Sequence, residues 1–200
     1  MNNLAQALTF GGILNTDEID RILGASVVKT LRAGEHFFKP GDIADQLAFI
    51  DAGVFRVYIP GGEMEEATRY FMRKNQFMMD LESFYDNRPA TSGIQAVTGA
   101  RLLVITRRDW NLLNEAISKL FLLTKSLTVS ALINKIRDNE YLHFGTAKQK
   151  YDEFVKRYPD LALTVPLQYI ASYLQITPQS LSRIRKAAGR KKPCSDKNEY

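Results

Sequence analysis

The sequence predicts an α+β protein in which an antiparallel β-roll precedes a long helix and a pair of short helices around a tight turn. Three observations support this. Turn residues interrupt short β-type runs between residues 31 and 107, residues 115–142 contain neither Gly nor Pro, and residues 164–186 fit a helix-turn-helix pattern. We therefore divide the 200 residues into three segments, 1–114, 115–143 and 144–200.

The first segment begins with an expected helical lead-in over the first 30 residues, with Thr16 or Asp17 as an N-cap. Residues 39–42, Lys-Pro-Gly-Asp, are typical of a type II turn, and Gly61-Gly62 is expected at a hairpin tip. Many short strands at this spacing indicate an antiparallel roll or barrel. The expected strands are residues 47–50, 54–59, 68–72, 92–97 and 102–105.

The second segment is expected to be a long helix that follows a short one beginning at Asp109 or Asn111. Its apolar positions form a partial heptad, in which one polar residue could set the register of a partner helix. The predicted dimer helix positions are Leu120, Leu123, Leu127, Ala131 and Asn134. The alternative is a helix that packs only against its own chain.

The third segment contains the most specific pattern. We expect Thr164 to cap the first short helix and Thr177 to cap the second, with Pro178 at the first helical position. Only Gln175 and Ile176 lie between these helices. Such turns often carry glycine, so a left-handed backbone at Gln175 would be strained.

The outward face of the second helix is polar and basic, which suits contact with DNA. Arginine can bind guanine and glutamine can bind adenine in the major groove, while the basic residues that follow suit phosphate. Residues 141–200 carry a charge of +6 and residues 1–140 a charge of −1, which favours a polyanionic partner. The predicted DNA-binding residues are Thr177, Gln179, Ser180, Ser182, Arg183, Lys186, Arg190 and Lys191. The alternative is a helical hairpin with a merely solvated polar face.

These residues give the chain a resemblance to the CRP/FNR family of bacterial transcription regulators. The stretch from Tyr169 to Arg185 is similar to the version seen in the Bacteroidetes branch, and Gly34-Glu35, Gly41-Asp42 and residues 49–53 resemble the turns of the family's roll. The resemblance implies a cyclic-nucleotide-binding-like jelly roll, a dimerisation helix and a (winged) helix-turn-helix. It also implies a homodimer on near-palindromic double-stranded DNA, with RNA polymerase as a further candidate partner. The stretch after Gly189 looks short for a full wing.

The expected effector site departs from the family's pattern. Cyclic-nucleotide binders of this fold carry a Gly-Glu pair, a short helix, and then Arg followed by a hydroxyl residue. Here Met79 and Asp80 take the first pair of positions, Ala90 takes the Arg position and Arg88 lies two residues early. Losing the only phosphate cation disfavours tight binding of cyclic AMP, so we expect no cofactor. The expected degenerate pocket comprises Met79, Asp80, Leu81, Arg88, Ala90 and Thr91, and the alternative for its charged residues is a surface loop.

Composition excludes several other classes. The single cysteine, Cys194, rules out an internal disulfide framework and a cysteine-held iron–sulfur cluster. His36 and His143 are far apart in the sequence, so we expect no metal site, and no arrangement of catalytic residues indicates an enzyme. With no apolar run of spanning length and no signal peptide, we expect a cytoplasmic protein without membrane contact. The alternative function is a dimeric small-molecule sensor that acts through protein contacts.

Overall fold

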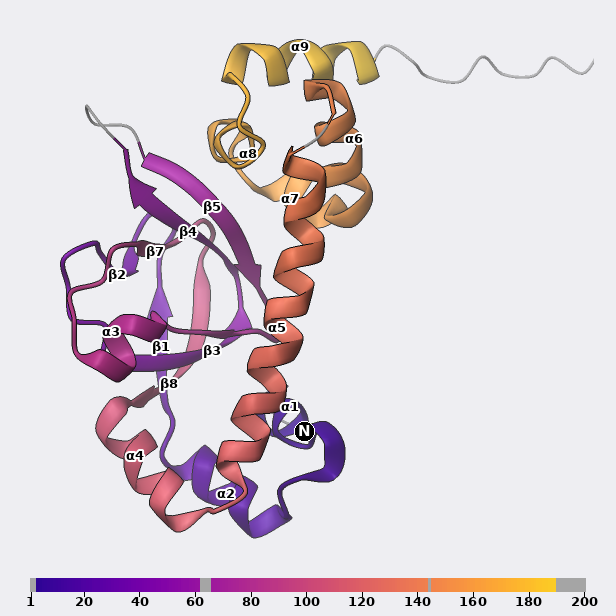
Figure 1. Cartoon of the computed structure of the whole chain (residues 1–200). Coiled ribbons are helices and arrows are strands. Elements are labelled where there is room, and N and C mark those ends of the chain that lie inside the picture. The colour runs from indigo at the N-terminus through magenta and orange to yellow at the C-terminus, as the bar shows by residue number, and fades with distance from the viewer. Residues whose placement is uncertain (1–2, 62–65, 144, 190–200) are drawn as a thin grey trace, which may run out of the picture. The chain divides into compact units, whose positions relative to one another are not determined.

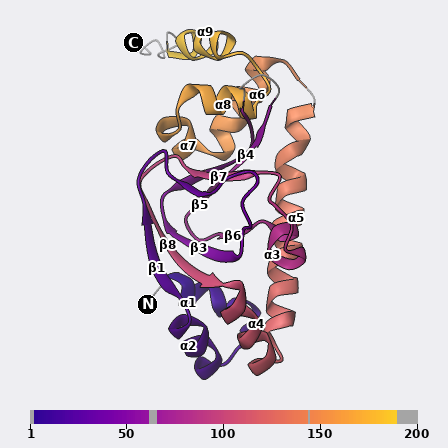
Figure 2. The ribbon, with the colours of Figure 1, turned by 90° about the vertical axis from the view of Figure 1, so that its left-hand side faces the viewer.

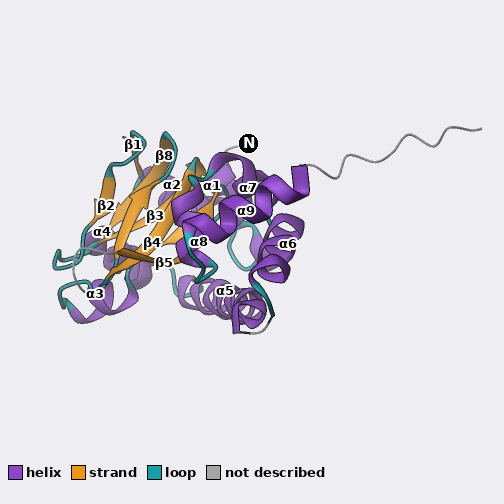
Figure 3. Cartoon of the chain, turned by 90° about the horizontal axis from the view of Figure 1, so that it is seen from above, coloured by secondary structure: helices purple, strands orange, loops and turns teal. Residues whose placement is uncertain are grey.

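The computed structural model describes residues 3–61, 66–143 and 145–189, and its contacts divide the chain into two compact units (Figure 1). The first unit is Met1–Arg137 and the second is Asp138–Tyr200. The described strands all belong to the first unit, whereas the described part of the second unit is helical (Figure 3). The boundary between the units falls within the long helix α5, Leu120–His143.

The described strands form two four-stranded sheets (Figure 2). All their pairings are antiparallel, so the predicted antiparallel roll is confirmed. Sheet A has the order β1-β8-β3-β6 and sheet B the order β2-β7-β4-β5. Their bounds are Val27–Leu31 for β1, His36–Phe38 for β2, Gln46–Ala52 for β3, Val54–Pro60 for β4, Glu66–Arg73 for β5, Phe77–Met78 for β6, Gly93–Ala96 for β7 and Ala100–Thr106 for β8.

The helices of the first unit begin slightly earlier than expected. Their bounds are Asn3–Leu8 for α1, Phe10–Gly12 for the 3-10 turn η1, Thr16–Gly24 for α2, Leu81–Asp86 for α3 and Arg107–Ala116 for α4. The N-cap of α2 is Asn15, not Thr16 or Asp17, because Asn15 and Glu18 form a reciprocal capping box. Thr106 caps α4 in place of Asp109 or Asn111, because its hydroxyl accepts the backbone N–H of Asp109.

Sheet A separates two hydrophobic cores because alternate residues of a strand point to opposite faces. On one face, Leu47, Phe49 and Leu103 join residues of α1, α2 and α4 in an outer core. On the other face, Ala48, Ile50 and Leu102 pack with residues of sheet B in an inner core. Aromatic side chains fill much of the inner core: Phe37, Phe38 and Phe55.

The turns of the roll follow their glycines. The expected type II turn is confirmed, since Gly41 has a φ of 93° and the N–H of Asp42 donates to the carbonyl of Lys39 at 3.1 Å. The β4–β5 hairpin closes with Pro60 paired to Glu66. The predicted tip at Gly61-Gly62 reaches residues 62–65, which lie outside the described part of the chain.

Helix α5 packs against the roll through one side only. Leu120 and Leu123 are buried in the outer core, and Leu127 packs against the same core from a half-buried position. The expected single helical stretch from residue 115 is interrupted instead, since α4 ends at Ala116 and Ile117 leaves the helical conformation. Burial of Ile117 in the outer core accompanies this break.

The described part of the second unit contains the end of α5 and four further helices. These are α6, Ala147–Arg157; α7, Pro159–Thr164; α8, Leu167–Tyr173; and α9, Pro178–Gly189. Phe154 of α6, Ile170 of α8 and Leu181 of α9 are fully buried. The ring of Phe154 lies 5.8 Å from that of Tyr173, which ties α6 to α8.

Candidate functional site

The turn between α8 and α9 has a defined left-handed geometry. The N–H of Ile176 donates to the carbonyl of Ala171 and that of Gln175 to the carbonyl of Ser172, which is a Schellman motif. Gln175 is the left-handed residue of this motif, with a φ of 56°. The expectation that glutamine takes a glycine position here is confirmed. The motif fixes the direction in which the chain leaves α8 for α9.

The caps of this region differ from expectation at one end. Thr177 caps α9 as predicted, because its hydroxyl accepts the N–H of Ser180 at 3.1 Å and donates to the Ser180 hydroxyl at 2.9 Å. Thr164 does not cap α8. It is the last residue of α7, where its hydroxyl donates to the carbonyl of Asp160, and α8 begins after Pro166 without a side-chain cap.

Two opposite sides of α9 have different chemistry. Gln179, Arg183 and Lys186 are exposed and are spaced by four and three residues, so they form one stripe along the helix. Leu181 is fully buried on the other side, and Ile184 and Arg185 are half-buried. The stripe has the length, polarity and charge that contact with base edges and phosphates requires.

The cations of the stripe have no carboxylate on their own helix. Helix α9 contains no acidic residue, whereas on α6 Lys148 pairs with Asp152, and Glu153 pairs with Arg157 and Lys156. The Arg157 hydrogen bond lowers the pKa of Glu153. Two carboxylates therefore offset part of the positive charge of α6, whereas no carboxylate of α9 offsets the exposed cations Arg183 and Lys186.

The structure brings most of the predicted DNA-binding residues together on α9. Gln179, Arg183 and Lys186 are exposed, and Ser180 and Ser182 are half-buried beside them. The hydroxyls of Thr177 and Ser180 are already engaged in the cap. Arg190 and Lys191, and any wing, lie outside the described residues. Sequence reasoning missed Arg185, whose inward direction follows from its place two residues after Arg183.

At helix α3, polar side chains of the expected effector region bond to one another and to the backbone. The carboxylate of Asp80 accepts the N–H of Ser83 at 3.0 Å and the hydroxyl of Ser92 at 3.2 Å. The buried hydroxyl of Ser83 in turn accepts the N–H of Ala44 at 2.7 Å. At the other end of α3, Arg107 donates to the Asn87 side chain at 2.8 Å and to two helix carbonyls. The start of α3 thus carries a negative charge of its own.

The other predicted pocket residues differ in burial and do not share one environment. Ala90 is buried in the inner core, with its N–H and carbonyl bonded to Asp42 and Gly41. Met79 packs against the outer core. Leu81, Arg88 and Thr91 are exposed. The position expected to carry a phosphate-binding arginine therefore holds a buried methyl group.

Tyr70 of β5 connects the roll to α5. Its ring packs against the inner core, and the ammonium of Lys135 lies 3.6 Å from the ring centre. Burial raises the pKa of the Tyr70 hydroxyl and lowers the pKa of Lys135. This contact places Lys135 of α5 beside strand β5 of the roll.

An exposed apolar stripe runs along α5 on the side opposite the outer core. Leu122, Val129, Ile133 and Ile136 are 44–55% exposed and lie within about 60° of one another around the helix. The predicted dimer positions lie on the other side. Leu120 and Leu123 are packed inside their own domain, so they are not accessible to a partner helix, whereas Ala131 and Asn134 are exposed. Helix α5 is thus apolar on two opposite sides.

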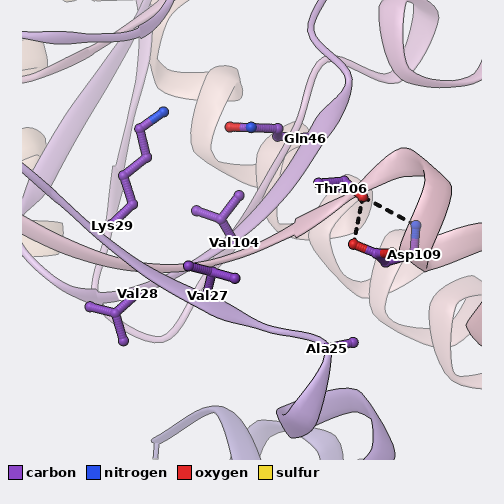
Figure 4. Close-up of a pocket in the computed structure, with 8 residues that line it drawn as sticks. All are labelled: Ala25, Val27, Val28, Lys29, Gln46, Val104, Thr106 and Asp109. Carbon is purple, nitrogen blue, oxygen red and sulfur yellow. Dashed lines mark hydrogen bonds between the residues drawn. The ribbon is translucent and has the colours of Figure 1, made fainter.

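A surface hollow of about 320 Å³ lies where β1 begins and β8 ends (Figure 4). Its lining residues are Ala25, Val27, Val28, Lys29, Gln46, Val104, Thr106 and Asp109. The polar groups of Thr106 and Asp109 bond to each other in the α4 cap. The hollow contains none of the predicted site residues.

In the described part of the chain, no group of three His, Cys, Asp or Glu side chains is arranged to hold a metal ion. None of the helices found in residues 3–61, 66–143 and 145–189 is long and apolar enough to cross a membrane.

Comparison with known proteins relates both units to other structures. Residues 28–115 match the family model of the cyclic nucleotide-binding domain. The catabolite activator protein of Thermus thermophilus is 18% identical, with a TM-score of 0.56 over 92% of this chain and 87% of that chain. The c-di-GMP responsive global regulator CLP of Xanthomonas campestris is 16% identical, with a TM-score of 0.69 over 88% and 92%. FixK2 from Bradyrhizobium japonicum is 14% identical, with a TM-score of 0.69 over 82% and 85%. No curated protein sequence matches the chain.

Proposed function

We propose that this chain, which carries a cyclic nucleotide-binding domain in the fold of the CRP/FNR regulators, is a sequence-specific DNA-binding transcription regulator that acts as a homodimer in the cytoplasm. The observation that carries the proposal is the exposed stripe of Gln179, Arg183 and Lys186 on α9, held by a left-handed turn after α8. An exposed helix with this spacing and charge fits the major groove.

The roles of the stripe residues follow from their chemistry. Arg183 can donate two parallel hydrogen bonds to guanine, and Gln179 can bond both edge atoms of adenine. Lys186 lies about two turns beyond Gln179, where its single ammonium suits a phosphate better than a base edge. Arg183 and Gln179 would therefore specify sequence, and Lys186 would contribute affinity to every duplex.

The exposed stripe of α5 is the proposed dimer contact. Four apolar side chains in one line along a helix favour burial against a second helix, and Leu122, Val129, Ile133 and Ile136 supply that line. A two-fold dimer would present two copies of α9 to half-sites about 34 Å apart. Regulation would then consist of any event at the roll that alters this spacing.

Cyclic AMP is not the proposed effector. Ala90 is buried at the position expected to carry the phosphate-binding arginine, so it supplies no cation. Without that cation, tight binding of a cyclic phosphate is unfavourable. RNA polymerase remains a candidate partner that follows from the fold alone.

Two variants with opposite expected behaviour test DNA reading. Arg183→Ala should cost about 1–3 kcal/mol on the preferred duplex and relax the preference at one base pair. Lys186→Ala should weaken binding to all duplexes alike and reduce the slope of log K against log salt by about 1. Titration of preferred and scrambled duplexes over a salt series measures both effects. Identical behaviour of the two variants would contradict the assignment.

A second pair of variants tests the dimer. Ile133→Glu places a charge in the centre of the exposed stripe and should dissociate the dimer in sedimentation velocity. Asn134→Glu changes the neighbouring exposed position, which lies about 100° around the helix, and should leave the dimer intact. The reverse result would place the contact on the side that includes Asn134.

A further inference from the structure

We propose that Arg185 is a positioning residue that holds α9 in the rotation at which Arg183 and Gln179 face DNA. The inference rests on the proposed function, because it concerns how the same helix is held. The described part of α9 carries three cations, Arg183, Arg185 and Lys186. A reading from charge alone would assign all three to DNA, yet only two of them are exposed.

The guanidinium of Arg185 bonds to two other helices. Its Nε donates to the Tyr151 hydroxyl of α6 at 2.9 Å, and its Nη2 donates to the backbone carbonyl of Ala162 in α7. Tyr151 and Ala162 are both buried, and they precede Arg185 by 34 and 23 residues. One side chain on α9 therefore ties together α6, α7 and α9.

The Ala162 carbonyl is an acceptor that its own helix cannot satisfy. In a continuing helix it would accept the N–H of the residue four positions later, but that residue is Pro166, which has no N–H. The neighbouring carbonyl of Leu161 does receive its helical partner, the N–H of Val165. Arg185 supplies the missing donor, and a charged donor makes a stronger bond than a neutral one.

The direction of Arg185 determines the direction of the stripe. Two positions along a helix differ by about 200°, so Arg183 faces outward when Arg185 faces inward. A rotation of α9 that released Arg185 would carry Arg183 away from its outward direction. The paired bonds to Tyr151 and Ala162 oppose such a rotation because both acceptors are fixed in other helices.

The test compares binding to a preferred duplex and to a scrambled duplex at several salt concentrations. Arg185→Met keeps the aliphatic stem and removes the donors, and Tyr151→Phe removes only the hydroxyl acceptor. Both should lower the ratio of the two affinities, by roughly tenfold for Arg185→Met, because a misplaced bidentate contact loses its discrimination. The salt slope should stay unchanged. Tyr85→Phe, which removes an exposed hydroxyl of the first unit, is the matched control and should leave the ratio unchanged.

Two results would overturn the proposal. If Arg185→Met lowers the salt slope by about 1 while Tyr151→Phe leaves the ratio unchanged, then Arg185 contacts phosphate directly. If both variants lower the melting temperature while the folded protein keeps the wild-type ratio, then Arg185 has only a structural role. A wild-type protein that prefers no duplex would instead overturn the proposed function. Failure of the proposed function therefore appears in the wild type, whereas failure of the Arg185 proposal appears only in the variants.

Discussion

Replacing Gln175 by glycine should stabilise the second unit. Gln175 is an exposed L-residue at a φ of 56° in the turn between α8 and α9. A left-handed conformation costs an L-residue about 1–2 kcal/mol. Glycine adopts it freely but loses about 0.5–1 kcal/mol more backbone entropy on folding. The net gain for Gln175→Gly is therefore about 1 kcal/mol, since no buried contact of the side chain is lost.

Hydrogen exchange of the α8 and α9 amides measures this gain locally. A stabilisation of about 1 kcal/mol should slow exchange through opening of the unit by about fivefold. Gln175→Ala is the control, because alanine retains the Cβ atom that makes the left-handed conformation unfavourable, and its exchange should match the wild type. Unchanged exchange in the glycine variant, or equal slowing in both variants, would refute the strain argument.

Three other predictions concern the first unit. Gly93→Ala should destabilise the roll by about 1–3 kcal/mol in thermal unfolding, because the added Cβ would lie 2.4 Å from the buried Tyr58 ring. The control Gly99→Ala should be tolerated, because its Cβ would meet nothing within 4 Å. Equal melting temperatures of the two variants would contradict the predicted clash. Leu123→Ala should cost about 2–5 kcal/mol in denaturant unfolding, and a cost near zero would show that α5 does not pack on the outer core. Burial lowers the pKa of His36, so its contribution to stability should be complete above its ordinary pKa near 6.5 and decline as pH falls below that value. His36→Asn should reduce this decline in pH-dependent unfolding. An unchanged pH profile of the variant would contradict a role of His36 in the decline.

The fold class could be predicted because its signals are local. Proline and glycine mark the turn at residues 39–42, and the caps and apolar spacing of α9 lie within ten residues of one another. Strand β1, Val27–Leu31, was missed, and the predicted helical lead-in over the first 30 residues is wrong there, because the pairing of β1 with β8 determines its conformation. The short strands β2 and β6 were also missed because runs of three and two residues have no readable periodicity. Their positions depend on pairing with β7 and β3, which are distant in the sequence.

The sites could be predicted only where a helix alone determines which side chains face outward. On α9, spacing was enough to place Gln179, Arg183 and Lys186 together. On α5, spacing gave two apolar sides, and only the tertiary packing shows that Leu120 and Leu123 belong to the core. The spacing within α9 could show that Arg185 points inward, but not that its partners are Tyr151 of α6 and Ala162 of α7.

The α3 region shows why a sequence comparison could suggest an altered pocket without giving its geometry. Position by position, Ala90 in place of arginine indicates a missing cation. The hydrogen bonds that the Asp80 carboxylate accepts from the Ser83 N–H of α3 and from the Ser92 hydroxyl do not follow from the motif alone. The structure therefore adds the hydrogen-bond partners of Asp80 to the loss of a cation that the sequence indicates.

A protein that binds DNA as a dimer without cyclic AMP should select the same site whether or not that nucleotide is present. Selection of bound duplexes from a random pool, at fixed moderate salt and with or without cyclic AMP, measures this. We predict that the same near-palindromic site, with half-sites about one helical turn apart, is enriched in both arms. Enrichment only with cyclic AMP would contradict the account of α3, and the absence of any enriched sequence in both arms would contradict the proposed function.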